Sequence, residues 1–426
     1  MAHIFRRFRR HADQLRWRQR DLTDRLLFSV RREAHCVARF RESLPSRALC
    51  QRPVRLLVDI SVIHRHDAGT GIQRVVRSLR DRLRTHVGSD VAIDHAIVER
   101  MRDGYVTIEG SPLTGGPDQL FFGLDFATDA VFQAQKQLEE LRRSGTTMWF
   151  LVHDILPISH PHWFTYPSRL KYRRWLRTCA KLADGIFCVS PDVAEKLEYL
   201  MATRYGRKDM PRIVTISPGS DIVPEQPVPA PERLPQAANL DVGLFARSVL
   251  IVGTLEPRKG HADALAAFDH LWRTGHQIPL VLIGRPGWNT SALQRSIRDH
   301  AQHGRLLFWF DDIDDEALQA AYQHCGLTLV PSLAEGYGLP LDEALALGSP
   351  VLARDIPVFH RHPRANVHYF PNDASPRSIA SAVLEALNSS QNVANPADLP
   401  NWDLAAQQIA QAFACAVGDA SLTSTD

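Results

Sequence analysis

The chain has 426 residues, of which 44% are apolar and 23% are charged, and its formal net charge is +3. This length predicts two domains, and the composition is typical of a soluble globular protein. No run approaches the roughly 18 apolar residues that a membrane span needs, so we expect any membrane contact to be peripheral. The six cysteines are scattered without the spacing of a zinc site or a disulfide framework, which favours a reducing cytoplasm.

Residues 1–50 are predicted to form a basic helical extension. The first 55 residues contain 15 Arg against five acidic residues, a balance of +10. Within residues 1–44, apolar side chains fall near one stripe of a helix, with arginines around it; they are Leu15, Leu22, Leu26, Val30 and Val37. Such a helix can lie on an anionic membrane surface or pack on protein, and the sequence leaves both interpretations open. The short run "LLFSV" is not a secretory signal.

Residues 51–223 alternate short apolar runs with longer amphipathic stretches. The runs at 54–63, 119–126, 147–156, 185–190 and 212–219 are typical of buried strands or strand ends, and the stretches at 71–83 and 168–183 of helices. This alternation predicts βαβ units in an α/β domain with a parallel sheet. A linker is expected at 224–240, because five of the 12 residues from Pro224 to Pro235 are proline.

A second and more regular alternating series runs through residues 241–400, and the amphipathic end at 401–426 can pack as a helix on either domain. Two parallel α/β domains joined by a hinge place the carboxyl ends of both sets of strands on a shared cleft. Ligands of open α/β sheets usually bind at such strand ends.

The segment "VPSLAEGYGLPLDEALALGSP" at 330–350 combines a strand end, a glycine turn and a helix. Gly336 and Gly338 let the backbone approach a ligand closely, and free N–H groups at the helix start favour a phosphate. Glu335 in the turn is suited to accept hydrogen bonds from the hydroxyls of a sugar or a ribose. Glu343 could equally serve the helix by complementing the helix dipole in the first turn.

A cation pair stands at the start of the same domain. In "VGTLEPRKGH" (252–261), Gly253 ends the first strand, and Arg258 and Lys259 precede a helix. Arg binds phosphate oxygens through two donors while Lys acts as a point charge, so the pair suits a diphosphate. A solvated pair in a turn is the alternative interpretation. The strand-end loop "LIGRPGW", with Gly284 and Arg285, is a place where a nucleotide base can lie.

Four segments, at 252–260, 280–288, 311–322 and 330–359, together resemble the C-terminal domain of the retaining glycosyltransferases of family 4. The resemblance covers most of residues 248–360. It implies the GT-B fold, in which two Rossmann-like parallel-sheet domains face each other across a cleft. The segments "DAGTGIQRVV", "VHDILP" and "ADGIFCVS" of the first domain agree with it, and "GTGIQR" resembles bacterial mannosyltransferases of lipopolysaccharide and exopolysaccharide assembly. The first fifty residues have no recognised counterpart.

The resemblance also implies roles for particular residues. Glu335 would contact the transferred sugar, Glu343 would accept the ribose hydroxyls, and His153 would lie against the sugar on the acceptor side. Arg258 and Lys259 would neutralise the diphosphate without a divalent metal, and Gly71 would bring the N-terminal loop onto the phosphates. The expected donor-binding positions are Gly71, Gly253, Arg258, Lys259, Gly284, Arg285, Glu335, Gly336, Tyr337, Gly338, Leu339 and Glu343. One departure is Arg354, where the family commonly has a small residue.

The activity expected from the resemblance is retaining transfer of a hexose, mannose from GDP-mannose, to a lipid-linked or polysaccharide acceptor at the inner face of the cytoplasmic membrane. No cofactor, metal or nucleic-acid partner is expected. A UDP-sugar or another nucleotide-sugar donor remains an alternative, as does a non-catalytic sugar-nucleotide-binding protein. A glycoside hydrolase would also use two carboxylates, but it has no use for the cation pair or for two nucleotide-type domains.

Overall fold

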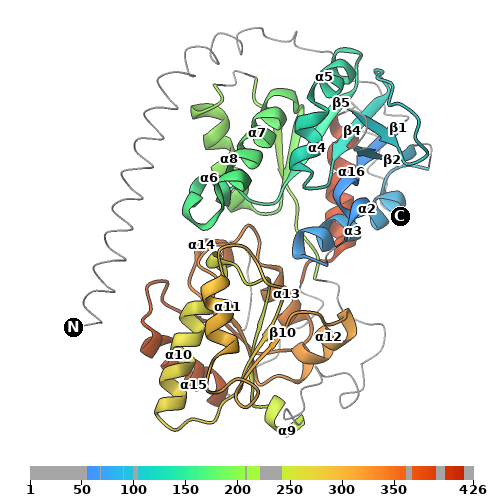
Figure 1. The fold of residues 1–426 in the computed structure, drawn as a ribbon. Coiled ribbons are helices and arrows are strands. Elements are labelled where there is room, and N and C mark those ends of the chain that lie inside the picture. The colour runs from blue at the N-terminus through green and yellow to red at the C-terminus, as the bar shows by residue number, and fades with distance from the viewer. Residues whose placement is uncertain are drawn as a thin grey trace, which may run out of the picture. The chain divides into compact units, whose positions relative to one another are not determined.

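The computed structural model describes residues 55–67, 69–89, 91–98, 104–206, 209–220, 242–360, 367–389 and 399–416. The predicted basic extension (1–50) and the predicted linker (224–240) lie outside these ranges, so both stay predictions. The described chain forms two sheets with helices packed on them (Figure 1); one is all parallel, and the other is parallel except for its edge strand. The α/β expectation is therefore confirmed.

The first sheet has seven strands in the order β3-β2-β1-β4-β5-β6-β7. The strands are β1 (Arg55–Asp59), β2 (Ala92–Val98), β3 (Tyr105–Thr107), β4 (Gln119–Gly123), β5 (Thr147–Val152), β6 (Gly185–Cys188) and β7 (Arg212–Thr215). Every neighbouring pair is parallel except β2 and β3. The sequence did not predict β2 or β3, because Asp94 and His95 interrupt the apolar pattern of one and the other has three residues.

Helices follow most strands of this half along the chain, but none lies in the described residues between β2, β3 and β4. The helices are α2 (Ser61–Arg65), α3 (Gly71–His86), α4 (Thr128–Gln133), α5 (Gln135–Arg143), α6 (Leu156–Ser159), the 3-10 helix η1 (Pro161–Trp163), α7 (Tyr166–Leu182) and α8 (Pro191–Thr203). A capping box starts α3: the Thr70 hydroxyl accepts from the Gln73 N–H, and the Gln73 side chain accepts from the Thr70 N–H. This cap fixes the glycine loop that precedes the helix.

The second sheet has six strands, all parallel, in the order β10-β9-β8-β11-β12-β13. The strands are β8 (Val249–Val252), β9 (Leu280–Ile283), β10 (Leu307–Phe310), β11 (Leu327–Val330), β12 (Val351–Arg354) and β13 (Val367–Phe370). The order reverses at β8, and in the first sheet at β1. Ligands of open α/β sheets bind beyond the strand ends at such switch points.

The second half contributes further helices. They are α9 (Val242–Phe245), the 3-10 helix η2 (Pro257–Lys259), α10 (His261–Arg273), α11 (Ser291–Arg298), α12 (Asp315–His324), α13 (Leu339–Ala346), α14 (Pro357–His360) and α15 (Pro376–Asn388). Among the helices of the described ranges, none has both the length and the apolarity to cross a bilayer.

The last helix, α16 (Trp402–Ala416), returns to the first domain. It runs beside α3 (Figure 1). The Phe413 ring lies 5.6 Å from that of Trp149 on β5 and 5.5 Å from that of Phe187 on β6. The structure thus decides between the two packing partners that the sequence left open.

Candidate active site

Glu335 lies in the loop between β11 and α13, and its carboxylate is enclosed by donors. The Arg258 guanidinium and the Lys259 ammonium each donate to it at 2.6 Å, and the Ser332 hydroxyl donates at 2.8 Å. Burial by itself would raise the pKa of Glu335, but the charges of Lys259 and Arg258 lower it to about 2. The group is therefore a fixed carboxylate at neutral pH, and it cannot act as a general acid there.

The two cations stand on η2, between β8 and α10. Arg258 also donates through Nε to Glu256 at 2.7 Å, and its backbone carbonyl accepts from the Leu333 N–H. Burial lowers the pKa of Arg258, but Glu335 and Glu256 raise it above its ordinary value, so the guanidinium stays charged. The structure places the cation pair next to the Glu335 carboxylate. The sequence had assigned the cations to the diphosphate of the ligand and the carboxylate to its sugar.

Glu343 is buried on α13 and is the fifth residue of that helix. The first-turn interpretation of this residue is therefore wrong, and Asp342 is the acidic residue of that turn. One oxygen of Glu343 accepts from the Tyr322 hydroxyl at 2.9 Å, and the other accepts from Arg74 on α3. The sequence did not single out Arg74, although it lies in the quoted segment "GTGIQR".

The glycines of the loop allow close contacts between backbones. A Cβ on Gly336 would stand 2.1 Å from the His153 carbonyl oxygen. The Gly336 carbonyl also accepts from the Ser190 hydroxyl at 2.6 Å. Gly338 has a φ of 99°, in the left-handed region. Its position and that of Gly336 therefore exclude a side chain, so the loop reaches the ends of β5 and β6 only because it carries glycine.

The starts of two helices also meet. A Cβ on Gly71, the first residue of α3, would lie 3.7 Å from the Leu339 side chain at the start of α13. Helix starts present free N–H groups and the positive end of the helix dipole. The predicted phosphate-facing loop and the predicted phosphate-binding helix thus lie side by side.

His153 directly follows β5, and its ring is buried. Its Nε2 has no hydrogen-bond partner among the described residues. Burial lowers the pKa of His153 to about 4, so the imidazole is neutral at physiological pH. A buried ring nitrogen without a partner carries a desolvation cost that a ligand hydroxyl would remove.

Of the other predicted donor-binding residues, some lie beside the cation pair and some do not. A Cβ on Gly284 would stand 2.1 Å from the Gly253 carbonyl oxygen, and one on Gly253 would lie 3.6 Å from the Lys259 Cε, so both glycines adjoin the cation pair. The Tyr337 hydroxyl donates to the Pro218 carbonyl at 3.0 Å, and its ring joins the first domain's core. Arg285 is half-exposed and pairs with Asp312 at 3.5 Å. The structure does not bring these last two side chains to Glu335.

Arg354, the departure noted in the sequence, supports the loop from behind. It is buried, and it donates to the Pro331 carbonyl at 2.9 Å, to the Asn372 carbonyl at 2.5 Å and to the Asp263 carboxylate at 2.7 Å. Pro331 directly follows β11, so this arginine fixes the point where the Glu335 loop begins. A small residue at this position would leave that carbonyl without the Arg354 donor.

The chain has two sheets, and the site residues described above follow strands of both. This arrangement is that of the GT-B architecture. Sucrose-phosphate synthase from Thermosynechococcus elongatus has a similar fold, with a TM-score of 0.53 and 19% identity over 85% of this chain and 95% of that chain. The HepE protein of Anabaena, solved with UDP and glucose, gives a TM-score of 0.51 and 14% identity over 86% of this chain and 97% of that chain. These likenesses establish the fold.

Sequence comparison makes the assignment more specific. Residues 246–398 match the family model of the glycosyl transferases group 1. The chain is 37% identical over 366 residues to the serotype-specific mannosyltransferase WbdA of Escherichia coli, an alignment that covers 82% of this chain and 43% of WbdA. The chain thus spans less than half the length of these curated relatives. It has the GT-B fold, its residues 246–398 form a domain of the glycosyl transferases group 1, and its sequence resembles bacterial mannosyltransferases.

Proposed function

We propose that this protein transfers mannose from GDP-mannose, with retention of configuration, to a lipid-linked or polysaccharide acceptor in bacterial surface glycan synthesis. The similarity to the mannosyltransferase WbdA supports the sugar. The observation that carries the proposal is the buried cluster in which Arg258 and Lys259 enclose the ionised carboxylate of Glu335. Such a cluster places positive charge for a diphosphate beside an acceptor for sugar hydroxyls.

In this mechanism the bond between the sugar's anomeric carbon and the diphosphate oxygen breaks while the acceptor hydroxyl attacks on the same face. The proton of that hydroxyl passes to the leaving phosphate. Negative charge grows on the diphosphate, and Arg258 and Lys259 stabilise it. Arg has five N–H donors and Lys has three, so their bonds to Glu335 and Glu256 leave donors for phosphate oxygens. We propose that this charge compensation requires no divalent metal.

Glu335 would hold the transferred sugar through its hydroxyls, and its fixed negative charge would also favour positive charge that develops at the anomeric carbon. The neutral His153 would bond a sugar hydroxyl through Nε2, and Glu343 would accept the ribose hydroxyls. We place the enzyme at the inner face of the cytoplasmic membrane, where a lipid-linked acceptor would be available, with the basic residues 1–44 as the proposed contact.

The cluster predicts different effects for two substitutions. Glu335→Gln keeps the shape but removes the charge, so transfer should fall by about 100-fold or more while GDP affinity is mostly kept. Arg258→Ala should weaken both transfer and GDP binding, because it removes charge from the diphosphate site. The measurements are a product assay with GDP-mannose and isothermal titration with GDP.

Arg273→Ala is the control, because Arg273 is exposed at the end of α10 and should leave both quantities unchanged. Full activity of Glu335→Gln would overturn the role of this carboxylate. A wild-type protein that binds nucleotide-sugars without turnover would support the non-catalytic alternative. A thermal-shift comparison of GDP-, UDP- and ADP-sugars tests the guanine base of the proposed donor.

A further inference from the structure

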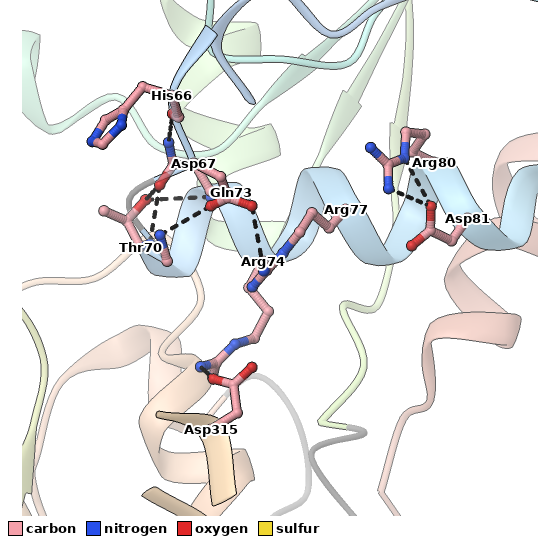
Figure 2. Close-up of polar contacts among 10 residues, drawn as sticks. His66, Asp67, Thr70, Gln73, Arg74, Arg77, Arg80, Asp81 and Asp315 are labelled. Carbon is pink, nitrogen blue, oxygen red and sulfur yellow. Dashed lines mark hydrogen bonds and ion pairs between the residues drawn. The ribbon is translucent and has the colours of Figure 1, made fainter. Parts of the chain in front are cut away.

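Arg74 links the first domain to the predicted ribose acceptor in the second. It lies on the first turn of α3 and donates to Oε1 of Glu343 on α13. Its other terminal nitrogen lies 3.3 Å from the Asp315 carboxylate at the start of α12, a contact that Figure 2 shows. The Arg74 side chain is 16% exposed and that of Glu343 is 3% exposed. The pair is therefore largely withdrawn from solvent.

The local needs of α3 do not explain this arginine. A cation near a helix start opposes the helix dipole, and Thr70 with Gln73 already caps the helix. Two other arginines of the same helix pair with acids close by in the sequence: Arg77 with Asp67 and Arg80 with Asp81 (Figure 2). Arg74 instead contacts two acids more than 200 residues away.

The contacts of Glu343 leave it able to bind a diol. A carboxylate offers about four acceptor positions, two on each oxygen. Arg74 occupies one on Oε1, and the Tyr322 hydroxyl occupies one on Oε2. One acceptor position therefore remains on each oxygen, and the vicinal hydroxyls of a ribose present two donors side by side. Two anchors, one from each domain, also fix the rotation of the carboxylate.

We propose that Arg74 is a specificity-determining residue for the nucleotide's ribose, because it holds Glu343 in the orientation that accepts the 2′- and 3′-hydroxyls. This inference rests on the proposed donor site. Arg74 acts through Glu343, so it is a positioning residue. Residues of both α3 and α13 would then form the ribose site, and Arg74 lies three residues after Gly71, where α3 begins.

The test compares GDP with 2′,3′-dideoxy-GDP by isothermal titration on the full chain, with UDP and its dideoxy analogue in parallel. Wild-type protein should bind the ribose form about tenfold or more tightly than the dideoxy form, because a buried polar site rejects a ligand that lacks the matching hydroxyls. In Arg74→Ala this ratio should fall below about threefold. The loss should come from weaker binding of the ribose form, with dideoxy binding unchanged.

Arg80→Ala is the matched control, because its partner Asp81 is on the same helix, and it should keep the wild-type ratio. Should Arg74→Ala fail to fold, Arg74→Gln carries the same expectation. An unchanged ratio, or tighter GDP binding by the variant, would overturn the inference; the second result would mean that Arg74 competes with the ribose. A wild-type protein that binds both forms equally would overturn it and leave the donor site standing. Binding of neither nucleotide would overturn the proposed function itself.

Discussion

Asp59, at the end of β1, is a buried carboxylate outside the proposed chemistry. Its Oδ1 accepts from the Ser61 N–H at 2.9 Å and from the Ser61 hydroxyl at 2.6 Å, and its Oδ2 accepts from the Tyr105 hydroxyl at 2.7 Å. Burial and the nearby charge of Asp125 raise the pKa of Asp59 to about 7. The hydrogen bonds from Ser61 and Tyr105 oppose this shift but do not cancel it.

Asp59 should make the stability of the protein fall as pH rises. At pH values below its ordinary pKa of 3.8, Asp59 is protonated in both the folded and the unfolded chain. Between that pKa and about 7 only the unfolded chain ionises, so the free energy of unfolding decreases, and above about 7 the loss is complete. Asp59→Asn should therefore lose less stability than wild type between pH 5 and 8, by several degrees in Tm.

The measurement is thermal unfolding of both proteins at several pH values in that interval. Asp81→Asn serves as the comparison, because the Asp81 side chain is 58% exposed and should leave the pH dependence of Tm unchanged. Equal pH dependence in Asp59→Asn and wild type would contradict the assignment of this carboxylate.

At the scale of elements, the loop between β11 and α13 depends on backbone contacts that side chains would block. Arg354 holds its first carbonyl, at Pro331, and Ser332 bonds Glu335 within it. Gly336 then meets the His153 carbonyl across the domain boundary. The position of the Glu335 carboxylate therefore depends on the fit of this loop against β5 and β6, in addition to the ion pairs.

Gly336→Ala should reduce transfer by about tenfold or more, because a Cβ at 2.1 Å from the His153 oxygen forces the loop to move and displaces Glu335. Steady-state kinetics with GDP-mannose would measure this. Gly116→Ala is a suitable control, since the nearest atom to its added Cβ is the flexible Gln119 amide at 3.8 Å. Wild-type turnover in Gly336→Ala would show that the loop tolerates displacement.

At the scale of the whole chain, α16 connects the end of the sequence to the core of the first domain. Phe413 packs edge-on against Phe122, Trp149 and Phe187, which lie on three neighbouring strands. Trp402 and Ile409 join the same core. The first domain is therefore completed by a helix that follows the whole second domain in the sequence.

Phe413→Ala should lower the free energy of unfolding by about 3 kcal/mol, because it leaves a cavity among aromatic rings. Urea denaturation followed by tryptophan fluorescence would report the change, since Trp149 adjoins the site. Leu404→Ala on the same helix should cost far less, because Leu404 is 40% exposed. A similar loss in both variants would mean that α16 is not docked through Phe413.

The sequence alone determined the alternation of strands and helices from β8 to β12, the glycine turn around Glu335 and the cation pair at 258–259. Periodicity, turn chemistry and capping act between residues that are close in the chain, so they can be predicted from spacing. The resemblance to a known family added the proposed roles of Glu335 and Glu343. Neither source indicated β2 and β3, whose burial depends on neighbouring strands more than on their own pattern.

Only the tertiary structure decided which partners these residues take. The pairing of Glu335 with Arg258 and Lys259, the contact of Arg74 with Glu343, and the return of α16 to the first domain all join residues far apart in the sequence. Long-range ion pairs and aromatic packing depend on the folded arrangement of several elements at once. The spacing of residues in the sequence does not predict that arrangement. The sequence could therefore identify the charged groups but not the partners that orient them.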